Sequence, residues 1–142
     1  MLKSKNTCMT AKLVKLVKNK IIKNKKGSII KFLKKGDKIF KSFGEIYFSE
    51  IKKNRIKGWN YHKKYTCIIT VPSGKVEFKI VNPKQKLIKK KISKKETLII
   101  PPRHWFSFKS LANNSVLVNF INGIHSDNET KKSKIIKNIK IN

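Results

Sequence analysis

Residues 66–83, TCIITVPSGKVEFKIVNP, carry the clearest structural signal in the chain. Residues 66–71 are an almost continuous β-branched run that stops at the Pro-Ser-Gly sequence of residues 72–74. Residues 76–80 then alternate apolar and charged side chains, the period of a half-buried strand, before Val-Asn-Pro at 81–83. The stretch therefore predicts two β-strands separated by a turn.

Similar signals recur on both sides of this stretch, with turns spaced about 10 residues apart. Strands are predicted at residues 29–33, 46–51, 85–92, 97–100 and 116–121, and turns at 26–28, 36–37, 101–102 and 122–123. This rhythm predicts an all-β sandwich or barrel.

At both ends of the chain, the sequence pattern fits more than one kind of secondary structure. Residues 1–26 are rich in lysine and hold apolar pairs, such as Leu13-Val14 and Leu16-Val17, at a spacing that fits an amphipathic helix or an edge strand. From Thr130 onward the chain is basic with isolated isoleucines, which fits a short helix or a frayed end.

The length of 142 residues is enough for one domain with its own core, residues 1–142. The formal charge of +29 would suggest a phosphate-rich partner such as nucleic acid. However, only two of the 36 basic residues, Arg55 and Arg103, are arginine, the side chain that best fits bidentate phosphate and guanine contacts. The lysines also spread over nearly every segment, so we interpret them mainly as solvated surface.

Cys8 and Cys67 lie in different contexts, one in a polar stretch and one in an apolar run, so they do not form a disulfide framework. The sequence shows no apolar stretch long enough for a signal peptide or a membrane span. We therefore expect a soluble, cytoplasmic protein.

Common catalytic and cofactor motifs are absent from the sequence. It holds no nucleophile-elbow, P-loop or dinucleotide-binding glycine pattern. His62, His104 and His125 are far apart and have no neighbouring ligand at metal-binding spacing. The sequence therefore predicts a protein without a metal or cofactor.

Five segments together resemble a known family. They are GEIYFS at 44–49, IKGWNYHKK at 56–64, VPSGKV at 71–76, IIPPRHWFSF at 99–108 and HSDNE at 125–129. In this order they resemble the cupin-type dTDP-sugar epimerases, in particular the dTDP-4-dehydrorhamnose 3,5-epimerases and the related dTDP-hexose 3,4-ketoisomerases. The most specific part is Lys57-Gly58-Trp59 followed by His62, with the Pro-Ser-Gly turn downstream.

The resemblance implies a cupin jelly-roll barrel over residues 24–130, with short basic N- and C-terminal extensions. It also implies a homodimer that acts without a metal on a nucleotide-linked 4-keto sugar. The family commonly has histidines where this chain has Asn60 and Phe106, and its ketoisomerase-like members place a second histidine at the position of His62. Because alternate strand residues share a face, we expect Asn60 and His62 to point the same way.

These positions lead to an assignment of catalytic roles. Removing a proton beside a ketone needs a base, an acid and donors for the enolate oxygen. We predict His62 as the base, because histidine is the residue type that most often serves as a general base. Tyr61 is the predicted phenolic acid, with Tyr65 and Tyr47 as alternatives, and Asn60 is the predicted amide donor.

Four further residues are predicted to bind substrate: Lys57, Trp59, Tyr47 and His104. Lys57 takes the place of an arginine that lies near the diphosphate in the epimerases. Trp59 fits the core or a dimer interface as well as a stacking role. His104 fits an exposed loop as well as a site, and His125 fits a turn.

The leading hypothesis is an enzyme that epimerises or isomerises a dTDP-4-keto-6-deoxyhexose for surface polysaccharide synthesis. The replacement of two histidines by Asn60 and Phe106 supports an alternative, a cupin that binds a nucleotide-linked sugar without turnover. A basic nucleic-acid-binding barrel is the third hypothesis and rests on charge alone.

Overall fold

A computed structural model describes residues 13–137, which form twelve strands and no helix. The strands are β1 (Lys15–Lys18), β2 (Lys20–Asn24), β3 (Gly27–Lys31), β4 (Glu45–Lys52), β5 (Ile56–His62), β6 (Cys67–Ser73), β7 (Val76–Val81), β8 (Leu87–Ile92), β9 (Glu96–Ile100), β10 (Trp105–Ser110), β11 (Asn114–Ile121) and β12 (Thr130–Lys132). The all-β prediction is confirmed. No helix in the described part of the chain could cross a lipid bilayer.

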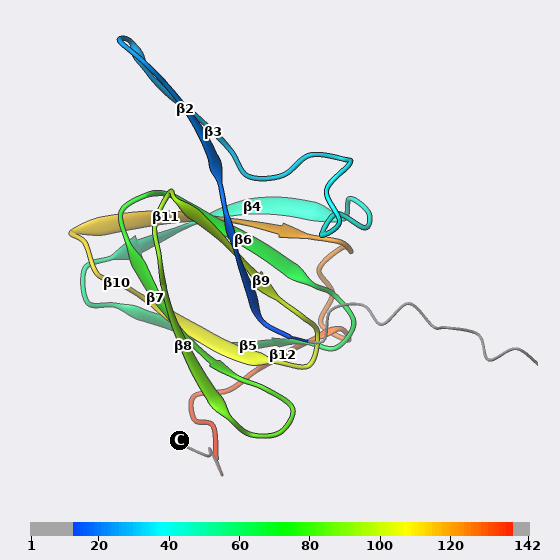
Figure 1. Ribbon diagram of the computed structural model, residues 1–142. Helices are drawn as coiled ribbons and strands as arrows, with labels where there is room; N and C mark the ends of the chain where they lie inside the picture. Colours follow the sequence, from blue (N-terminus) through cyan, green and yellow to red (C-terminus); the bar gives the residue numbers. More distant parts are fainter. Residues whose placement is uncertain (1–12, 138–142) are drawn as a thin grey trace, which may run out of the picture.

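Ten of the strands form two five-stranded antiparallel sheets that pack face to face (Figure 1). One sheet has the order β1-β9-β6-β11-β4 and the other the order β12-β5-β10-β7-β8. Neighbouring strands are often distant in sequence, as with β4 and β11, which pair from Glu45 opposite Ile121 to Lys52 opposite Asn114. This arrangement is a jelly roll, as the resemblance implied.

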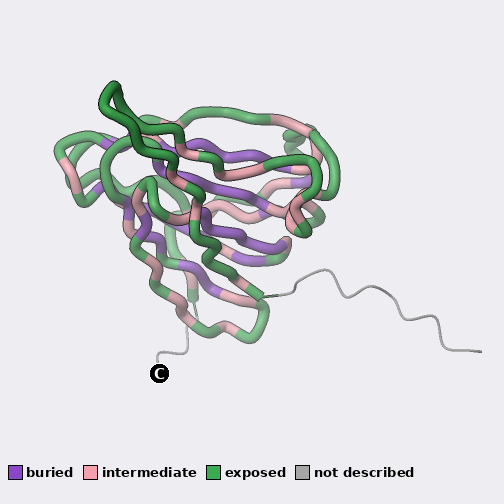
Figure 2. Tube along the Cα trace, turned by 45° about the horizontal axis from the view of Figure 1, so that its top comes forward, coloured by how far each residue is buried: buried purple, intermediate pink, exposed green. Residues whose placement is uncertain are grey.

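The core lies between the sheets and follows the alternation seen in the sequence. In β7, Val76, Phe78 and Ile80 are fully buried, whereas Lys79 is exposed and Glu77 is partly buried. Figure 2 shows the buried segments concentrated in the strands of the two sheets. No lysine among residues 13–137 is buried, which agrees with a solvated lysine surface.

The N-terminal segment forms strands, so the amphipathic helix considered for residues 1–26 is wrong for its described part. β1 pairs with β9 at the edge of a sheet, and β2 and β3 form a separate hairpin that projects from the sandwich (Figure 1). Cys8 lies outside the described residues. Strand β1 therefore extends the sandwich beyond the lower boundary, residue 24, predicted for the jelly roll.

The C-terminal segment also differs from the prediction. Thr130 begins neither a helix nor a frayed end but strand β12, which pairs with β5 so that Thr130 lies opposite His62 and Lys132 opposite Asn60. This pairing brings residues 130–132 next to the motif at residues 57–62. A strand of only three residues, two of them lysines, has too weak a sequence pattern to be recognised before its partner strand is known.

Candidate active site

A cavity of about 410 Å³ opens at one end of the sandwich, between the two sheets. Its lining includes polar side chains from both sheets and from the loop before β12: Glu45, Tyr47, Ser49, Lys57, Asn60, His62, Asn119, His125, Thr130, Lys131 and Lys132. Apolar residues that include Ile69, Phe106, Phe108 and Leu117 complete the wall. The cavity thus combines an apolar floor with titratable groups, as expected of a small-molecule site.

The central feature of this cavity is a pair formed by His62 and Glu129. The Nδ1 atom of His62 lies 2.7 Å from Oε2 of Glu129, and each residue is only 6% exposed. The other carboxylate oxygen, Oε1, accepts hydrogen bonds from the backbone amides of Lys64 at 3.1 Å and Tyr65 at 3.2 Å. The imidazole ring stacks near Phe106, with centroids 6.4 Å apart.

The carboxylate sets the tautomer of the histidine. Burial raises the pKa of Glu129, but the hydrogen bonds from His62 and from the amides of Lys64 and Tyr65 outweigh burial and hold the pKa below its ordinary value. The ionised carboxylate only accepts hydrogen bonds, so Nδ1 of His62 carries the proton. In the neutral ring, Nε2 is then the nitrogen that is free to take up a proton.

Glu129 is a candidate site residue that the sequence patterns did not reveal. It is the last residue of the segment HSDNE, which resembles the family pattern, but the sequence alone assigns it no role. That match was the available signal. It did not reveal the histidine partner because 67 positions separate the two residues.

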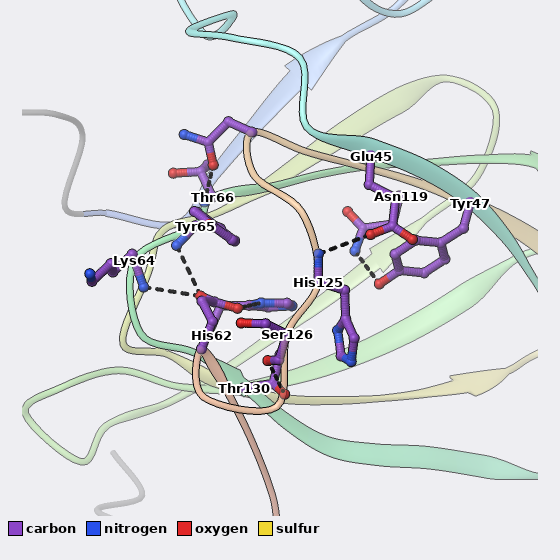
Figure 3. A network of polar contacts seen from close by, with 12 residues as sticks. Glu45, Tyr47, His62, Lys64, Tyr65, Thr66, Asn119, His125, Ser126 and Thr130 are labelled. Carbon is purple, nitrogen blue, oxygen red and sulfur yellow. Dashed lines mark hydrogen bonds and ion pairs between the residues drawn. The ribbon is translucent and has the colours of Figure 1, made fainter.

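A second polar pair, Tyr47 and Asn119, lies in the wall formed by β4 and β11. Nδ2 of Asn119 donates a hydrogen bond of 2.8 Å to the hydroxyl oxygen of Tyr47. Burial, with a smaller contribution from Cys67, raises the pKa of Tyr47 to about 12 despite this bond, so the phenol keeps its proton at neutral pH. Figure 3 shows the Asn119 contact to Tyr47, and His125 between His62 and Tyr47 in that view.

Asn60 and Lys57 both line the cavity, and a β-bulge explains how. Simple alternation would place residues 57 and 60 on opposite faces of β5. The register between β5 and β10 shifts so that Gly58 pairs with Ser107 and Asn60 with Phe106, which leaves Trp59 as the extra residue. Asn60 and His62 thus share the inner face, as predicted.

Gly58 makes this bulge possible. Its φ of +117° is unfavourable for residues with a side chain, and a Cβ atom there would lie 2.8 Å from the carbonyl oxygen of Phe106.

Across the cavity mouth, Lys57 Nζ donates to Oγ of Ser49 at 2.8 Å. Lys57, Lys131 and Lys132 give this mouth three positive charges.

Three predicted site residues, Tyr61, Trp59 and His104, lie at the border of the cavity or outside it. Tyr61 borders it, but its ring packs on Trp105 with centroids 5.0 Å apart and lies under the Lys131 ammonium at 5.1 Å. Its position on β5 alternates with Asn60 and His62, so Tyr47 is better placed than Tyr61 as the phenolic acid. Trp59 lies outside the lining, and its backbone pairs with Ser133.

His104 also lies outside the cavity lining. The alternative of an exposed loop residue is wrong, because His104 is only 3% exposed and its Nδ1 lies 2.9 Å from the Pro102 carbonyl oxygen. Burial lowers the pKa of His104, although the hydrogen bonds to Pro102 and Pro101 act in the opposite direction. The geometry favours a structural role for this residue.

The remaining candidates, Tyr65, Cys67 and His125, lie in three different environments. Tyr65 lies outside the lining and packs against Gly123, where any added Cβ would collide with the phenol ring. Cys67 is buried in the core, and burial raises its thiol pKa to about 12, so it is not a nucleophile. His125 is exposed, lines the cavity, and is held by its backbone amide, which donates to Oε2 of Glu45 at 3.0 Å.

No three His, Cys, Asp or Glu side chains among residues 13–137 gather in a way that could hold a metal ion. His62 and Glu129 approach each other, but they bond to one another. Metal independence itself remains a prediction.

Comparisons with known proteins agree with this geometry at the level of the fold. No protein-family model and no curated protein sequence matches the chain. Among solved structures, a dTDP sugar isomerase from Desulfovibrio desulfuricans superposes with a TM-score of 0.80 and 25% identity, over 84% of this chain and 83% of that one.

Two further structures are similar at lower identity. The 3,4-ketoisomerase QdtA from Thermoanaerobacterium thermosaccharolyticum, solved as a mutant in complex with TDP-4-keto-6-deoxyglucose, has a TM-score of 0.75 at 21% identity and covers 84% and 87% of the two chains. The dTDP-4-dehydrorhamnose 3,5-epimerase from Sulfolobus tokodaii has a TM-score of 0.75 at 21% identity, with coverage of 94% and 87%.

The chain therefore has the jelly-roll fold of the dTDP-sugar isomerases and epimerases. This is the class that its sequence motifs resemble, and the suspected resemblance is confirmed.

Proposed function

We propose that this protein is an isomerase that removes a proton beside the ketone of a dTDP-4-keto-6-deoxyhexose and returns one to give an epimerised or isomerised sugar. The observation that carries the proposal is that His62, which is paired with the buried Glu129, and the protonated phenol of Tyr47 both line one cavity. A base and an acid on the walls of one pocket are the parts that enolisation requires. The similar structures named above support the substrate class.

His62 acts as the base in this proposal. The substrate C–H proton passes to Nε2, while Nδ1–H stays hydrogen-bonded to the Glu129 carboxylate, which stabilises the imidazolium that forms. Return of a proton to the opposite face of the same carbon gives the epimer. Return at the former carbonyl carbon, with loss of the neighbouring hydroxyl proton, gives the isomeric ketone.

Tyr47 and Asn60 stabilise the enolate. The pKa of Tyr47, raised to about 12 mainly by burial, keeps its hydroxyl protonated, so it donates to the sugar carbonyl oxygen as negative charge develops there. Asn60 provides neutral amide donors on the same face of β5 as His62. An amide cannot act as a base, so His62 alone has this role.

The three lysines at the cavity mouth suit the diphosphate of a nucleotide-linked sugar. Lys57 projects from the strand that carries His62, and Lys131 and Lys132 from the adjacent β12. Ammonium groups serve as point charges for phosphate. We further propose a cytoplasmic, metal-independent homodimer acting in polysaccharide synthesis, as the family resemblance implies.

The test is solvent exchange. We expect the purified protein, incubated with a dTDP-4-keto-6-deoxyhexose in heavy water, to incorporate deuterium at sugar carbons next to the ketone. His62→Ala should slow this exchange by about 10²- to 10⁴-fold. Mass spectrometry and proton NMR measure both the exchange and the product.

The alternative is a cupin that binds the nucleotide sugar without turnover, and the amide of Asn60 in the cavity is the observation that favours it. This alternative predicts measurable dTDP-sugar binding with no deuterium incorporation. Exchange in the wild type that persists unchanged in His62→Ala would instead contradict the assigned base.

A further inference from the structure

Asn119 is an unusual residue for its position in the wall. It lies on the inner face of β11 between Leu117 and Ile121, directly opposite Ile69 of β6, and it is 2% exposed. Its Oδ1 atom is enclosed and has no hydrogen-bond partner among the described residues. An unpaired buried polar atom is destabilising, so an apolar side chain would suit this wall better for stability alone.

The hydrogen bond that the side chain makes to Tyr47 explains its presence. Nδ2 of Asn119 donates to the hydroxyl oxygen of Tyr47 at 2.8 Å. A phenol has one proton, which lies close to the ring plane and can point to either side of the oxygen. Because the amide hydrogen occupies one side, the phenol proton is directed to the other.

Tyr47 lines the cavity, and within residues 13–137 no second hydrogen-bond partner takes its proton. The proton is therefore available to a bound molecule. If Asn119 accepted the bond instead, the phenol would donate its proton to the Asn119 side chain in the cavity wall and could not donate it to a bound molecule.

We propose that Asn119 is a positioning residue that directs the hydroxyl proton of Tyr47 into the cavity, toward the carbonyl oxygen of the bound keto sugar. This inference rests on the proposed function and adds to it the device that orients the acid. It explains why an amide with an unpaired oxygen occupies a position surrounded by apolar side chains. It also assigns Asn119 an effect on rate and not on affinity.

The test compares Asn119→Leu, Tyr47→Phe and the double variant with the wild type. Asn119→Leu keeps the branched shape of the side chain and removes the donor, so we expect kcat to fall about 10- to 100-fold while KM and the Kd for dTDP change little. In the Tyr47→Phe background, Asn119→Leu should cause no further loss, because the amide then has no hydroxyl to orient. Additive losses would overturn the proposal.

A second readout does not depend on turnover. With ¹³Cζ-labelled tyrosine, the Tyr47 resonance, assigned from Tyr47→Phe, should move in Asn119→Leu because the phenol oxygen loses its donor. An unchanged resonance means that the hydrogen bond is absent and overturns the inference. Wild-type protein that turns over no keto sugar refutes the proposed function, whereas active wild type with a fully active Asn119→Leu refutes only the role of Asn119.

Controls separate positioning from stability. Val118→Ala removes buried volume on the opposite face of the same strand, so it should lower Tm without lowering kcat. Asn119→Asp replaces the donor by an acceptor for the phenol proton and should lower kcat at least as much as Asn119→Leu. If Asn119→Leu fails to fold, Asn119→Ser, whose side chain is too short to reach Tyr47, serves in the same comparison.

Discussion

Nδ1 of His62 and Oε2 of Glu129 lie 2.7 Å apart, although 67 positions separate the two residues in the chain. The contact depends on β12, which begins with Thr130 and pairs with the end of β5 at His62. Glu129 is therefore held where its carboxylate determines which nitrogen of His62 is free.

Glu129→Gln should reduce turnover by about 10²-fold or more, because a correctly held tautomer is part of general-base catalysis. The amide oxygen of the glutamine can still accept from the backbone amides of Lys64 and Tyr65. Its NH₂ group would then face His62 and force Nδ1 to accept, which places the ring proton on Nε2. Steady-state kinetics with a dTDP-keto sugar measures the loss, and Glu129→Asp tests whether a shorter carboxylate restores part of the rate.

Tyr47→Phe should lower both deuterium exchange and product formation by about 10²- to 10³-fold, the usual effect of removing one donor to a developing oxyanion. Tyr61→Phe is the matched control, because the Tyr61 ring packs against Trp105 on the other side of β5. A larger effect from Tyr61→Phe than from Tyr47→Phe would return the acid role to Tyr61. Binding of dTDP should be similar in both variants.

Lys57→Ala should weaken dTDP binding by up to about fivefold at low salt, since an exposed ion pair contributes about 0.2–1 kcal/mol. The difference from wild type should shrink as salt is added, because the charges at the cavity mouth are screened. Isothermal titration calorimetry at two salt concentrations measures both effects. Lys79→Ala, an exposed lysine of β7 outside the cavity lining, should leave dTDP binding unchanged.

Acid should destabilise the wild type partly through Glu129. Burial acts to raise the pKa of this carboxyl, but its hydrogen bonds lower it overall, so the folded state binds a proton less readily than the unfolded chain. Its contribution to stability is present above the unfolded pKa, about 4.3, and is lost as pH falls through the folded pKa. Urea unfolding between pH 3 and 6 should show a shallower pH dependence in Glu129→Gln.

His104 should give a separate pH dependence nearer neutrality. Burial lowers its pKa, so the unfolded chain binds a proton more readily than the folded protein does. Its contribution to stability is complete above about pH 6.5 and is lost as the pH falls from there toward the folded pKa. His104→Gln should flatten the stability curve between pH 7 and 5. An equal flattening by His125→Gln, at an exposed position, would argue against this assignment.

The sequence predicted the fold well because its strongest signals are local. The β-branched run at residues 66–71 and the alternation at 76–80 depend on neighbours in the same strand, and both segments became strands. The short N- and C-terminal strands were ambiguous, because the apolar pairs in and before β1 fit a helix as well as a strand, and β12 has no apolar residue.

By itself, the sequence determined the all-β class, the shared inner face of Asn60 and His62, and the resemblance to dTDP-sugar epimerases and ketoisomerases. Only the tertiary structure placed Glu129 on His62, put Tyr47 and Asn119 into the cavity, and turned Tyr61 toward Trp105. Alternation along one strand follows from backbone geometry, which any short segment contains. The partners of these side chains are decided by strand pairing and sheet packing across the whole chain, which no short segment specifies.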